Sequence, residues 1–211
     1  MPGLFVTFEG GEGSGKSTQV TRLVERLAEA GLDPLVTREP GGTRLAEAIR
    51  ALLLDPGQAP GPVTEALLME AARADLVSTL LRPALGQGRV VLCDRYGDST
   101  LAYQGAGRGL DAGTLAAWNR IATGGLVPDL TFLFDVAPRL GLSRRATAEG
   151  RPNRLDLESE AFHTRVRERY LELARSEPGR FVVLDASRPA DTLAEAVWSA
   201  VSARLPAARS R

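Results

Sequence analysis

The sequence has few cysteines, few aromatic residues and no excess of either charge, and each shortage excludes a class of protein. The single cysteine, Cys93, cannot form an internal disulfide, and its apolar neighbours indicate a reduced core residue. Aromatic side chains make up 5% of the 211 residues, too few for a surface that stacks nucleic acid bases. Acidic and basic residues balance at 26 each, so no basic field attracts nucleic acid, and we expect no nucleic acid partner.

Long apolar runs are missing as well. No run approaches the roughly 20 residues of a membrane span, and the N-terminus lacks the basic and apolar regions of a signal peptide. We therefore expect no membrane contact and a cytoplasmic location. The length, with 44% hydrophobic residues, fits one domain over residues 1–211 that buries its own core.

Lysine is nearly absent, because only Lys16 among the 26 Lys and Arg residues is a lysine. It lies in the stretch Gly10–Ser17, which fits the phosphate-loop pattern G-x-x-x-x-G-K-[ST] at every fixed position. An apolar run over Leu4–Phe8 predicts a buried strand ahead of the loop, and helical spacing over Gln19–Ala30 predicts a helix behind it. A compact ammonium suits a site among phosphates, where the planar guanidinium of Arg is not equivalent.

The physical chemistry of this loop predicts a nucleotide site. Glycines let the backbone turn tightly and aim successive N–H groups at a phosphate, and the helix N-terminus adds positive charge. Lys16 can reach the outer phosphates, and the Ser17 hydroxyl can ligate Mg²⁺. The predicted nucleotide-binding residues are Gly10, Gly11, Glu12, Gly13, Ser14, Gly15, Lys16, Ser17 and Thr18.

Strand and helix patterns alternate along the rest of the chain, which predicts an α/β fold with right-handed parallel crossovers. Further strands are expected at Pro34–Thr37, Arg89–Cys93, Leu130–Asp135 and Phe181–Asp185. Further helices are expected at Leu45–Leu54, Val63–Leu85, Leu115–Ala122, Leu140–Thr147 and Leu193–Leu205. His163, the one histidine, lies in a polar helical stretch, and we expect it at the surface.

Charged residues follow two of the predicted strands. Arg38 comes after the second strand, and Asp94 and Arg95 come after the third. In open parallel sheets ligands bind at this edge, where Arg can hold a phosphate and Asp can serve Mg²⁺. Taken alone, Arg38 fits a turn equally well, Arg73 fits the solvated edge of its helix, and residues 97–109 fit a capped surface helix.

Four arginines gather around a Gly/Pro hinge at residues 149–153. Such a run fits a solvated face, and it also fits a mobile loop that neutralises the charge of a transferring phosphoryl group. The four are Arg144, Arg145, Arg151 and Arg154.

Three motifs together resemble the thymidylate kinase family, and their order and spacing match across nearly the whole chain. They are Phe8-Glu9-Gly10 continuing to Gly15-Lys16-Ser17-Thr18, then Thr37-Arg38-Glu39-Pro40-Gly41-Gly42, then Asp94-Arg95-Tyr96 with Ser99 and Ala102-Tyr103-Gln104-Gly105. The resemblance implies a three-layer P-loop kinase fold with a five-stranded parallel sheet and a short mobile lid at about 144–156. It also implies phosphate transfer from ATP-Mg to dTMP by a homodimer.

The resemblance implies particular roles around the acceptor. Arg38 and Arg95 would hold the dTMP phosphate, and Glu12 would meet the sugar 3′-hydroxyl. Arg73 would bond the thymine edge, and Tyr103 would crowd out a ribose 2′-hydroxyl. The implied substrate-binding residues are Glu12, Arg38, Met69, Arg73, Arg95, Ser99, Thr100, Tyr103 and Gln104; the catalytic residues are Lys16, Arg38, Arg95, Arg144, Arg151 and Arg154; and the metal ligands are Ser17 and Asp94.

Three positions bear on the subtype and on specificity. Glu12 is not basic, so the loop resembles the bacterial subtype, whose catalytic arginines lie in the lid. Met69 stands where the family commonly has a Phe that stacks on thymine, and a thioether can pack on a base face. Asn153-Arg154 replaces the usual Asp-Arg of the lid.

Two other functions compete with this one. A kinase for a deoxynucleoside or another monophosphate shares the loop, but an unphosphorylated acceptor would not need both Arg38 and Arg95. A regulatory NTPase switch is the alternative from a different class. The guanine-reading motif N-K-x-D is absent from the sequence, because its only lysine is Lys16.

Overall fold

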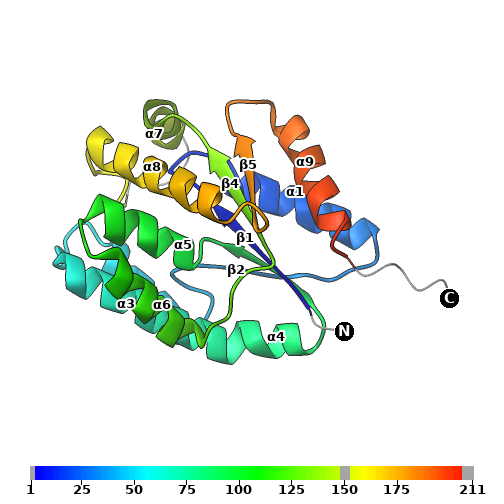
Figure 1. Cartoon of the computed structure of the whole chain (residues 1–211), viewed down its shortest axis with the longest axis horizontal. Coiled ribbons are helices and arrows are strands. Elements are labelled where there is room, and N and C mark those ends of the chain that lie inside the picture. The colour runs from blue at the N-terminus through cyan, green and yellow to red at the C-terminus, as the bar shows by residue number, and fades with distance from the viewer. Residues whose placement is uncertain (1–2, 148–152, 206–211) are drawn as a thin grey trace.

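The structure is a computed structural model that describes residues 3–147 and 153–205 (Figure 1). Within these residues five parallel strands form one sheet in the order β2-β3-β1-β4-β5. The predicted α/β fold with a five-stranded parallel sheet is therefore confirmed. The strands are β1 (Leu4–Glu9), β2 (Leu35–Arg38), β3 (Val90–Asp94), β4 (Leu130–Asp135) and β5 (Phe181–Asp185).

Helices cover both faces of the sheet, which makes three layers (Figure 1). The helices α1 and α9 pack together on one face, and α3, α4 and α8 lie on the other, where α2 packs against α3. The helices are α1 (Lys16–Glu29), α2 (Arg44–Leu54), α3 (Pro62–Leu76), α4 (Arg82–Gly86), α5 (Gly97–Thr100), α6 (Ala112–Thr123), α7 (Pro138–Thr147), α8 (Glu160–Ser176) and α9 (Ala190–Ser202), with π-helical segments η1 (Val77–Leu81) and η2 (Leu101–Gly107).

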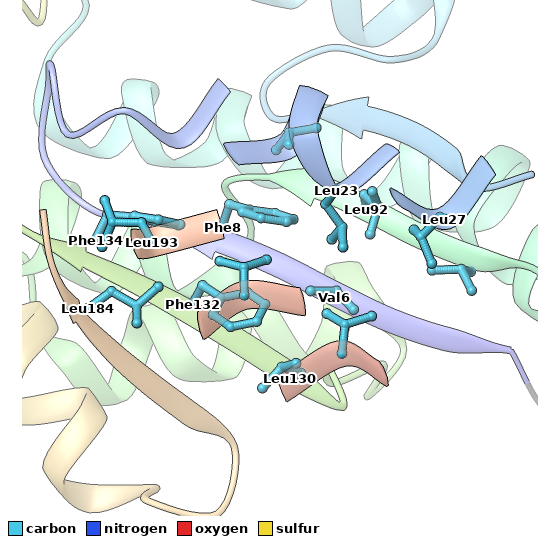
Figure 2. Close-up of a cluster of buried hydrophobic side chains, with 14 of the residues drawn as sticks. Val6, Phe8, Leu23, Leu27, Leu92, Leu130, Phe132, Phe134, Leu184 and Leu193 are labelled. Carbon is cyan, nitrogen blue, oxygen red and sulfur yellow. The ribbon is translucent and has the colours of Figure 1, made fainter. Parts of the chain in front are cut away.

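Alternating side chains of β1 serve the two layers. Val6 and Phe8 point to the α1 and α9 side, where they meet Leu23 of α1 and Leu193 of α9 (Figure 2). Phe5 points to the opposite face, in the cluster of β3, η1 and α4. Because both faces of the central strands are covered, these strands read as nearly continuous apolar runs. Such burial places the strand ends, and the loops that follow them, on a rigid frame.

The helix predicted over Val63–Leu85 is three consecutive segments. It runs as α3, widens to the π-helical η1, and restarts as α4 with Pro83 in its first turn. A proline has no N–H to donate and fits only the first turn of a helix, which accounts for the restart. The helix expected from Gln19 begins earlier, at Lys16, because Gly15 caps it in the left-handed conformation.

The surface prediction for His163 is wrong, and the alternative of a capped surface helix over residues 97–109 does not hold. His163 is only 4% exposed, and its ring meets the edge of Phe162 on α8. Residues 97–107 are largely buried rather than a surface helix, because α8 packs directly on η2. Among the described helices, none combines the length and apolar character needed to cross a bilayer.

Candidate active site

The carboxyl ends of three neighbouring strands meet at one edge of the sheet. Phe8 of β1 pairs with Asp94 of β3, and Asp94 pairs with Arg38 of β2, so the loops that follow start side by side. A cavity of about 470 Å³ opens at this edge. Its lining includes most of the predicted site: Glu12, Gly13, Ser14, Gly15, Lys16, Ser17, Thr18, Arg38, Met69, Asp94, Arg95, Ser99, Tyr103, Gln104, Arg144 and Arg154.

The phosphate loop requires glycine at Gly13 and Gly15, among other positions. Gly13 and Gly15 have φ values of 63° and 87°, in the left-handed region that side chains disfavour. A Cβ on Gly13 would also lie 2.0 Å from the carbonyl oxygen of Gly141, so α7 touches the loop backbone to backbone. The start of α7 is therefore packed against the backbone of the loop.

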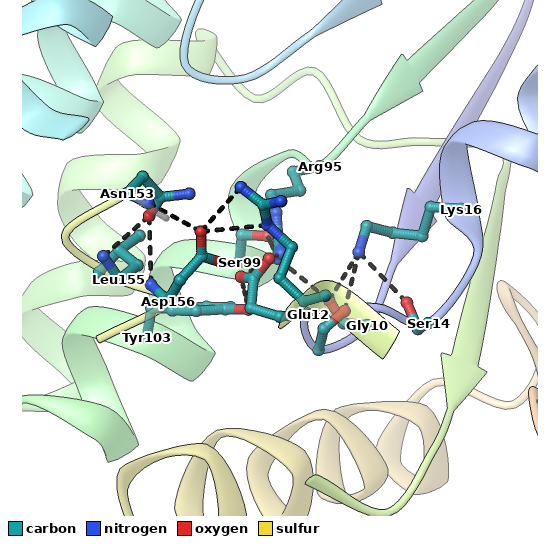
Figure 3. Close-up of polar contacts among 12 residues, drawn as sticks. Gly10, Glu12, Ser14, Lys16, Arg95, Ser99, Tyr103, Asn153, Leu155 and Asp156 are labelled. Carbon is teal, nitrogen blue, oxygen red and sulfur yellow. Dashed lines mark hydrogen bonds and ion pairs between the residues drawn. The ribbon is translucent and has the colours of Figure 1, made fainter. Parts of the chain in front are cut away.

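Lys16 folds back onto the loop (Figure 3). Its Nζ donates to the carbonyl oxygens of Gly10 and Gly11 at 3.1 and 3.0 Å, and to Ser14 Oγ at 3.2 Å. Burial, together with the positive charge of Arg95, lowers the pKa of Lys16. A phosphate oxygen bound in the loop could replace these carbonyl oxygens as the partner of the ammonium.

Ser17 and Asp94 offer oxygens suited to Mg²⁺. Ser17 Oγ donates to Asp94 Oδ2 at 3.2 Å. Asp94 Oδ1 is buried and has no hydrogen-bond partner among residues 3–147 and 153–205. Hard oxygen ligands beside a phosphate loop fit Mg²⁺, so the predicted pair fits the ion.

Arg95 lines the cavity next to the phosphate loop. Its φ is 70°, a strained value for a residue with a side chain, and such strain clusters at functional sites. Its guanidinium donates to Glu12 Oε1 at 2.8 Å and stacks 4.8 Å from the Tyr103 ring (Figure 3). Burial acts to raise the pKa of Glu12, but the charges of Arg95 and Lys16 outweigh it and lower that pKa to about 2.

Glu9 holds the residues next to Arg95 in place through hydrogen bonds. Its carboxylate accepts hydrogen bonds from the Tyr96 backbone N–H at 2.7 Å, Ser99 Oγ at 2.7 Å and Tyr170 Oη at 2.8 Å. Burial, reinforced by the charge of Asp98, raises the pKa of Glu9 to about 7. Sequence reasoning gave no role to Glu9, although the residue belongs to the first motif.

Two arginines of the β2–α2 region face the cavity differently. Arg38, with a side chain 53% exposed, pairs with Glu47 at 3.0 Å. Arg50 was not predicted, yet it lines the cavity and donates to the Pro40 carbonyl at 2.7 Å. Burial and the nearby Arg38 charge lower the pKa of Arg50. An arginine three residues after Glu47 on a helix carries no sequence signal for this position.

Of the predicted residues that the structure describes, the cavity lining does not include Gly10, Gly11, Arg73 and Thr100. Arg73 is 0% exposed and sits behind the wall. Its guanidinium pairs with Glu39 at 2.6 Å and Glu70 at 2.8 Å, and it donates to Asn119 Oδ1 at 2.5 Å. Thr100 Oγ1 is buried and, within the described part of the chain, lacks a partner. Met69 and Gln104 reach the lining from α3 and η2.

The arginines predicted to form a lid have different partners. Arg144 donates to the Ala186 carbonyl at 2.8 Å, and Arg145 pairs with Asp156 at 3.0 Å. Arg154 donates to the Leu53 carbonyl at 3.0 Å and pairs with a carboxylate of α3. Arg151 lies outside the described residues.

Asn153 has a local structural role. Its Oδ1 accepts from the backbone N–H groups of Leu155 at 2.8 Å and Asp156 at 3.2 Å (Figure 3). An Asp oxygen accepts in the same way, so the Asn at this position keeps the turn while removing a charge.

Comparisons with known proteins agree with this geometry. A family model described as thymidylate kinase matches residues 8–197. Thymidylate kinase of Deinococcus radiodurans is 54% identical over 202 residues, covering 96% of this chain and 98% of that protein. Thymidylate kinase of Thermomicrobium roseum is 57% identical over 198 residues, covering 94% of each.

A solved structure is similar in fold as well. The crystal structure of thymidylate kinase from Ehrlichia chaffeensis matches with a TM-score of 0.77 and 32% identity, covering 96% of this chain and 99% of that one. The sequence and structure matches thus extend over nearly the whole length. The chain belongs to the thymidylate kinase family.

Proposed function

We propose that this chain transfers the γ-phosphoryl group of ATP to the phosphate of dTMP, which gives ADP and the dTTP precursor dTDP. One observation carries the proposal: a single cavity is lined by a phosphate loop and by two further arginines, Arg38 and Arg95. The loop suits the donor, and the arginines suit an acceptor that already carries a phosphate. A deoxynucleoside kinase would have no use for both arginines.

On the donor side, the N–H groups of the loop and Lys16 bind the outer phosphates of ATP. Lys16 exchanges its contacts with the Gly10 and Gly11 carbonyls for phosphate oxygens. Ser17 and Asp94 would hold Mg²⁺, which neutralises phosphate charge when bound. Catalysis then consists of positioning and charge stabilisation by fixed groups, since phosphoryl transfer asks little covalent chemistry of the protein.

On the acceptor side, Arg95 holds the dTMP phosphate together with Arg38, and Arg50 adds a third cation. Glu12 accepts from the sugar 3′-hydroxyl, because its lowered pKa keeps it an acceptor at neutral pH. Tyr103, fixed by a 2.8 Å hydrogen bond to Glu12, occupies the space of a ribose 2′-hydroxyl.

The base lies against Met69 and Gln104, and Arg73 lies behind them without contacting the cavity. Because Glu39, Glu70 and Asn119 engage Arg73, we now propose that Arg73 fixes α3 behind the base rather than bonding the base in this arrangement. Arg144, Arg151 and Arg154 belong to a lid over residues 144–156 that closes on the donor. Arg154 must leave its present contacts to do so.

A homodimer and a cytoplasmic location complete the proposal. Leu67 of α3 is 49% exposed and Ile121 of the neighbouring α6 is 77% exposed, and these two helices pack side by side (Figure 1). Exposed apolar side chains on adjacent helices suit burial against a second copy. Light scattering during size exclusion measures the mass directly, and a monomer at micromolar concentration would contradict the dimer.

A coupled ADP-release assay against a panel of monophosphates tests the activity. We expect dTMP to be the preferred acceptor among dTMP, dUMP, dCMP, dAMP and dGMP. Equal or faster ADP release with another monophosphate would contradict the assignment of dTMP as the acceptor. Thymidine serves as the matched control, since it lacks only the phosphate that Arg38 and Arg95 are proposed to bind.

A further inference from the structure

A buried carboxylate on α3, that of Glu65, joins the base end of the cavity to the lid. Glu65 is almost fully buried and lines the cavity. Its Oε1 accepts from Gln104 Nε2 at 2.7 Å. Its Oε2 pairs with Arg154 at 2.7 Å and with Arg108 at 3.2 Å. No role was assigned to this residue from the sequence.

The charge of Glu65 fixes which way the Gln104 amide points. A carboxylate that faces two guanidinium groups presents acceptor oxygens to its neighbours. Gln104 must therefore turn its NH₂ group toward Glu65. Its carbonyl oxygen, Oε1, then takes the opposite side. That oxygen is buried and has no partner within residues 3–147 and 153–205.

An unpartnered acceptor in the cavity wall is costly unless a ligand donates to it. Thymine and cytosine differ at N3 of their pairing edges. Thymine carries a donor, N3–H, at the middle of its pairing edge, whereas cytosine carries a lone pair on N3. An oxygen facing N3 would attract thymine and repel cytosine, while a flipped amide would do the reverse.

We propose that Glu65 is a positioning residue for base choice: it holds Gln104 in the one orientation that presents an acceptor to the N3–H of thymine. The proposal rests on the dTMP kinase function above. Glu65 touches no substrate itself; it acts by forbidding the flipped amide. Its pairs with Arg154 and Arg108 hold it in place.

The test compares two acceptors that share phosphate, sugar and methyl group. These are dTMP and 5-methyl-dCMP, which differ only along the pairing edge. In Glu65→Gln the neutral amide can accept or donate, so Gln104 is free to flip. We expect the ratio of kcat/KM for dTMP to that for 5-methyl-dCMP to fall by at least about tenfold, the size of leaving one buried polar group without its hydrogen bond. Glu65→Asp, still acceptor-only, should keep the ratio even where its activity is lower.

Glu158→Gln is the matched control, because Glu158 pairs with Arg108 at 2.6 Å, whereas the Gln104 amide donates to Glu65. It should leave the ratio unchanged. An unchanged ratio in a folded Glu65→Gln protein would overturn the proposal, and so would an equal fall in Glu158→Gln. Should Glu65→Gln fail to fold, Gln104→Met removes the acceptor, and an unaltered ratio there is equally decisive.

The wild-type protein separates this proposal from the proposed function. If the wild type does not phosphorylate dTMP, the dTMP kinase function fails. If it does so and the ratio in the variants does not move, only the role of Glu65 fails.

Discussion

Lys16 brings together composition, geometry and chemistry in one side chain. It is the only lysine in the chain, and its Nζ lies within 3.2 Å of three oxygens of the phosphate loop. The loop wraps around an ammonium, a compact charge with three donors. A guanidinium is planar and larger, so it cannot take the same place.

Lys16→Ala should lower kcat at least about a hundredfold, because fixed charge supplies much of the stabilisation in phosphoryl transfer. Lys16→Arg should be impaired as well, despite keeping the charge. Steady-state kinetics with saturating ATP and dTMP measure both, after circular dichroism shows native helix content. Near-normal turnover in a folded Lys16→Ala protein would contradict the role of Lys16. Near-normal turnover in Lys16→Arg would show that a guanidinium can replace the ammonium.

Arg73 leads to a prediction about stability. It is buried with Glu39 and Glu70, and removing it leaves two buried carboxylates without their guanidinium. Arg73→Ala should lower the free energy of unfolding by about 3 kcal/mol, as for other broken buried ion pairs. Urea denaturation measures the loss. The matched variant Met69→Phe keeps an apolar side chain at the cavity wall and should cost less than about 1.5 kcal/mol.

At the scale of elements, two glycines allow the helix α7 to approach the phosphate loop closely. A Cβ on Gly141 would lie 2.3 Å from the Glu12 carbonyl oxygen, and one on Gly13 would meet Gly141 in turn. Close backbone contact of this kind fixes where Arg144 and Arg145 of α7 stand relative to the phosphate loop, and by our proposal relative to the donor. Displacement of α7 should therefore act on catalysis more than on acceptor binding.

Gly141→Ala should lower kcat about tenfold or more while changing the KM for dTMP little, because misplacing catalytic charges by about 1 Å is costly. Gly86→Ala is the control, since a Cβ there meets nothing within 4 Å. It should retain normal kinetics. A Gly141→Ala enzyme with unaltered kcat would show that the contact does not position the lid.

Elements were easier to predict than side-chain environments. The strand at Leu130–Asp135 was predicted residue for residue, because an apolar run between breakers is a local signal. The environment of Arg73 was not predictable locally, since two partners, Glu39 and Asn119, are 34 and 46 residues away. The same holds for Arg50, which reaches the cavity only because α2 packs on α3.

Within the candidate site, too, the parts that are contiguous in sequence were easier to predict than the parts assembled by the fold. The spacing of the glycines and Lys16 predicted the phosphate loop, because that loop is contiguous in sequence. Glu9 and Glu65 escaped prediction because each acts through a hydrogen-bonded network closed by residues at least 39 positions away. His163 was misplaced because its polar neighbours in sequence hide the packing of α8 on η2.

Across the whole molecule, buried Glu9 links stability to pH. Its pKa is raised from 4.5 to about 7, so the folded state binds more protons than the unfolded state between these values. The free energy of unfolding therefore falls as pH rises through this window. Glu9→Gln keeps a polar side chain without the ionisation, and the Ser99 and Tyr170 hydroxyls can reverse to meet its amide.

The free energy of unfolding of the variant minus that of the wild type should consequently rise by on the order of 2 kcal/mol between pH 5 and pH 8. Urea denaturation at unit pH steps measures the difference, in which other titrating groups cancel. A difference that stays constant over this range would show that Glu9 does not titrate there.

Identifying the product tests the central claim most directly. With ATP, Mg²⁺ and dTMP, we expect ³¹P NMR to show dTDP and ADP forming in equal amounts, and little reaction when thymidine replaces dTMP. ADP and free phosphate without dTDP, or thymidine phosphorylated faster than dTMP, would contradict the account.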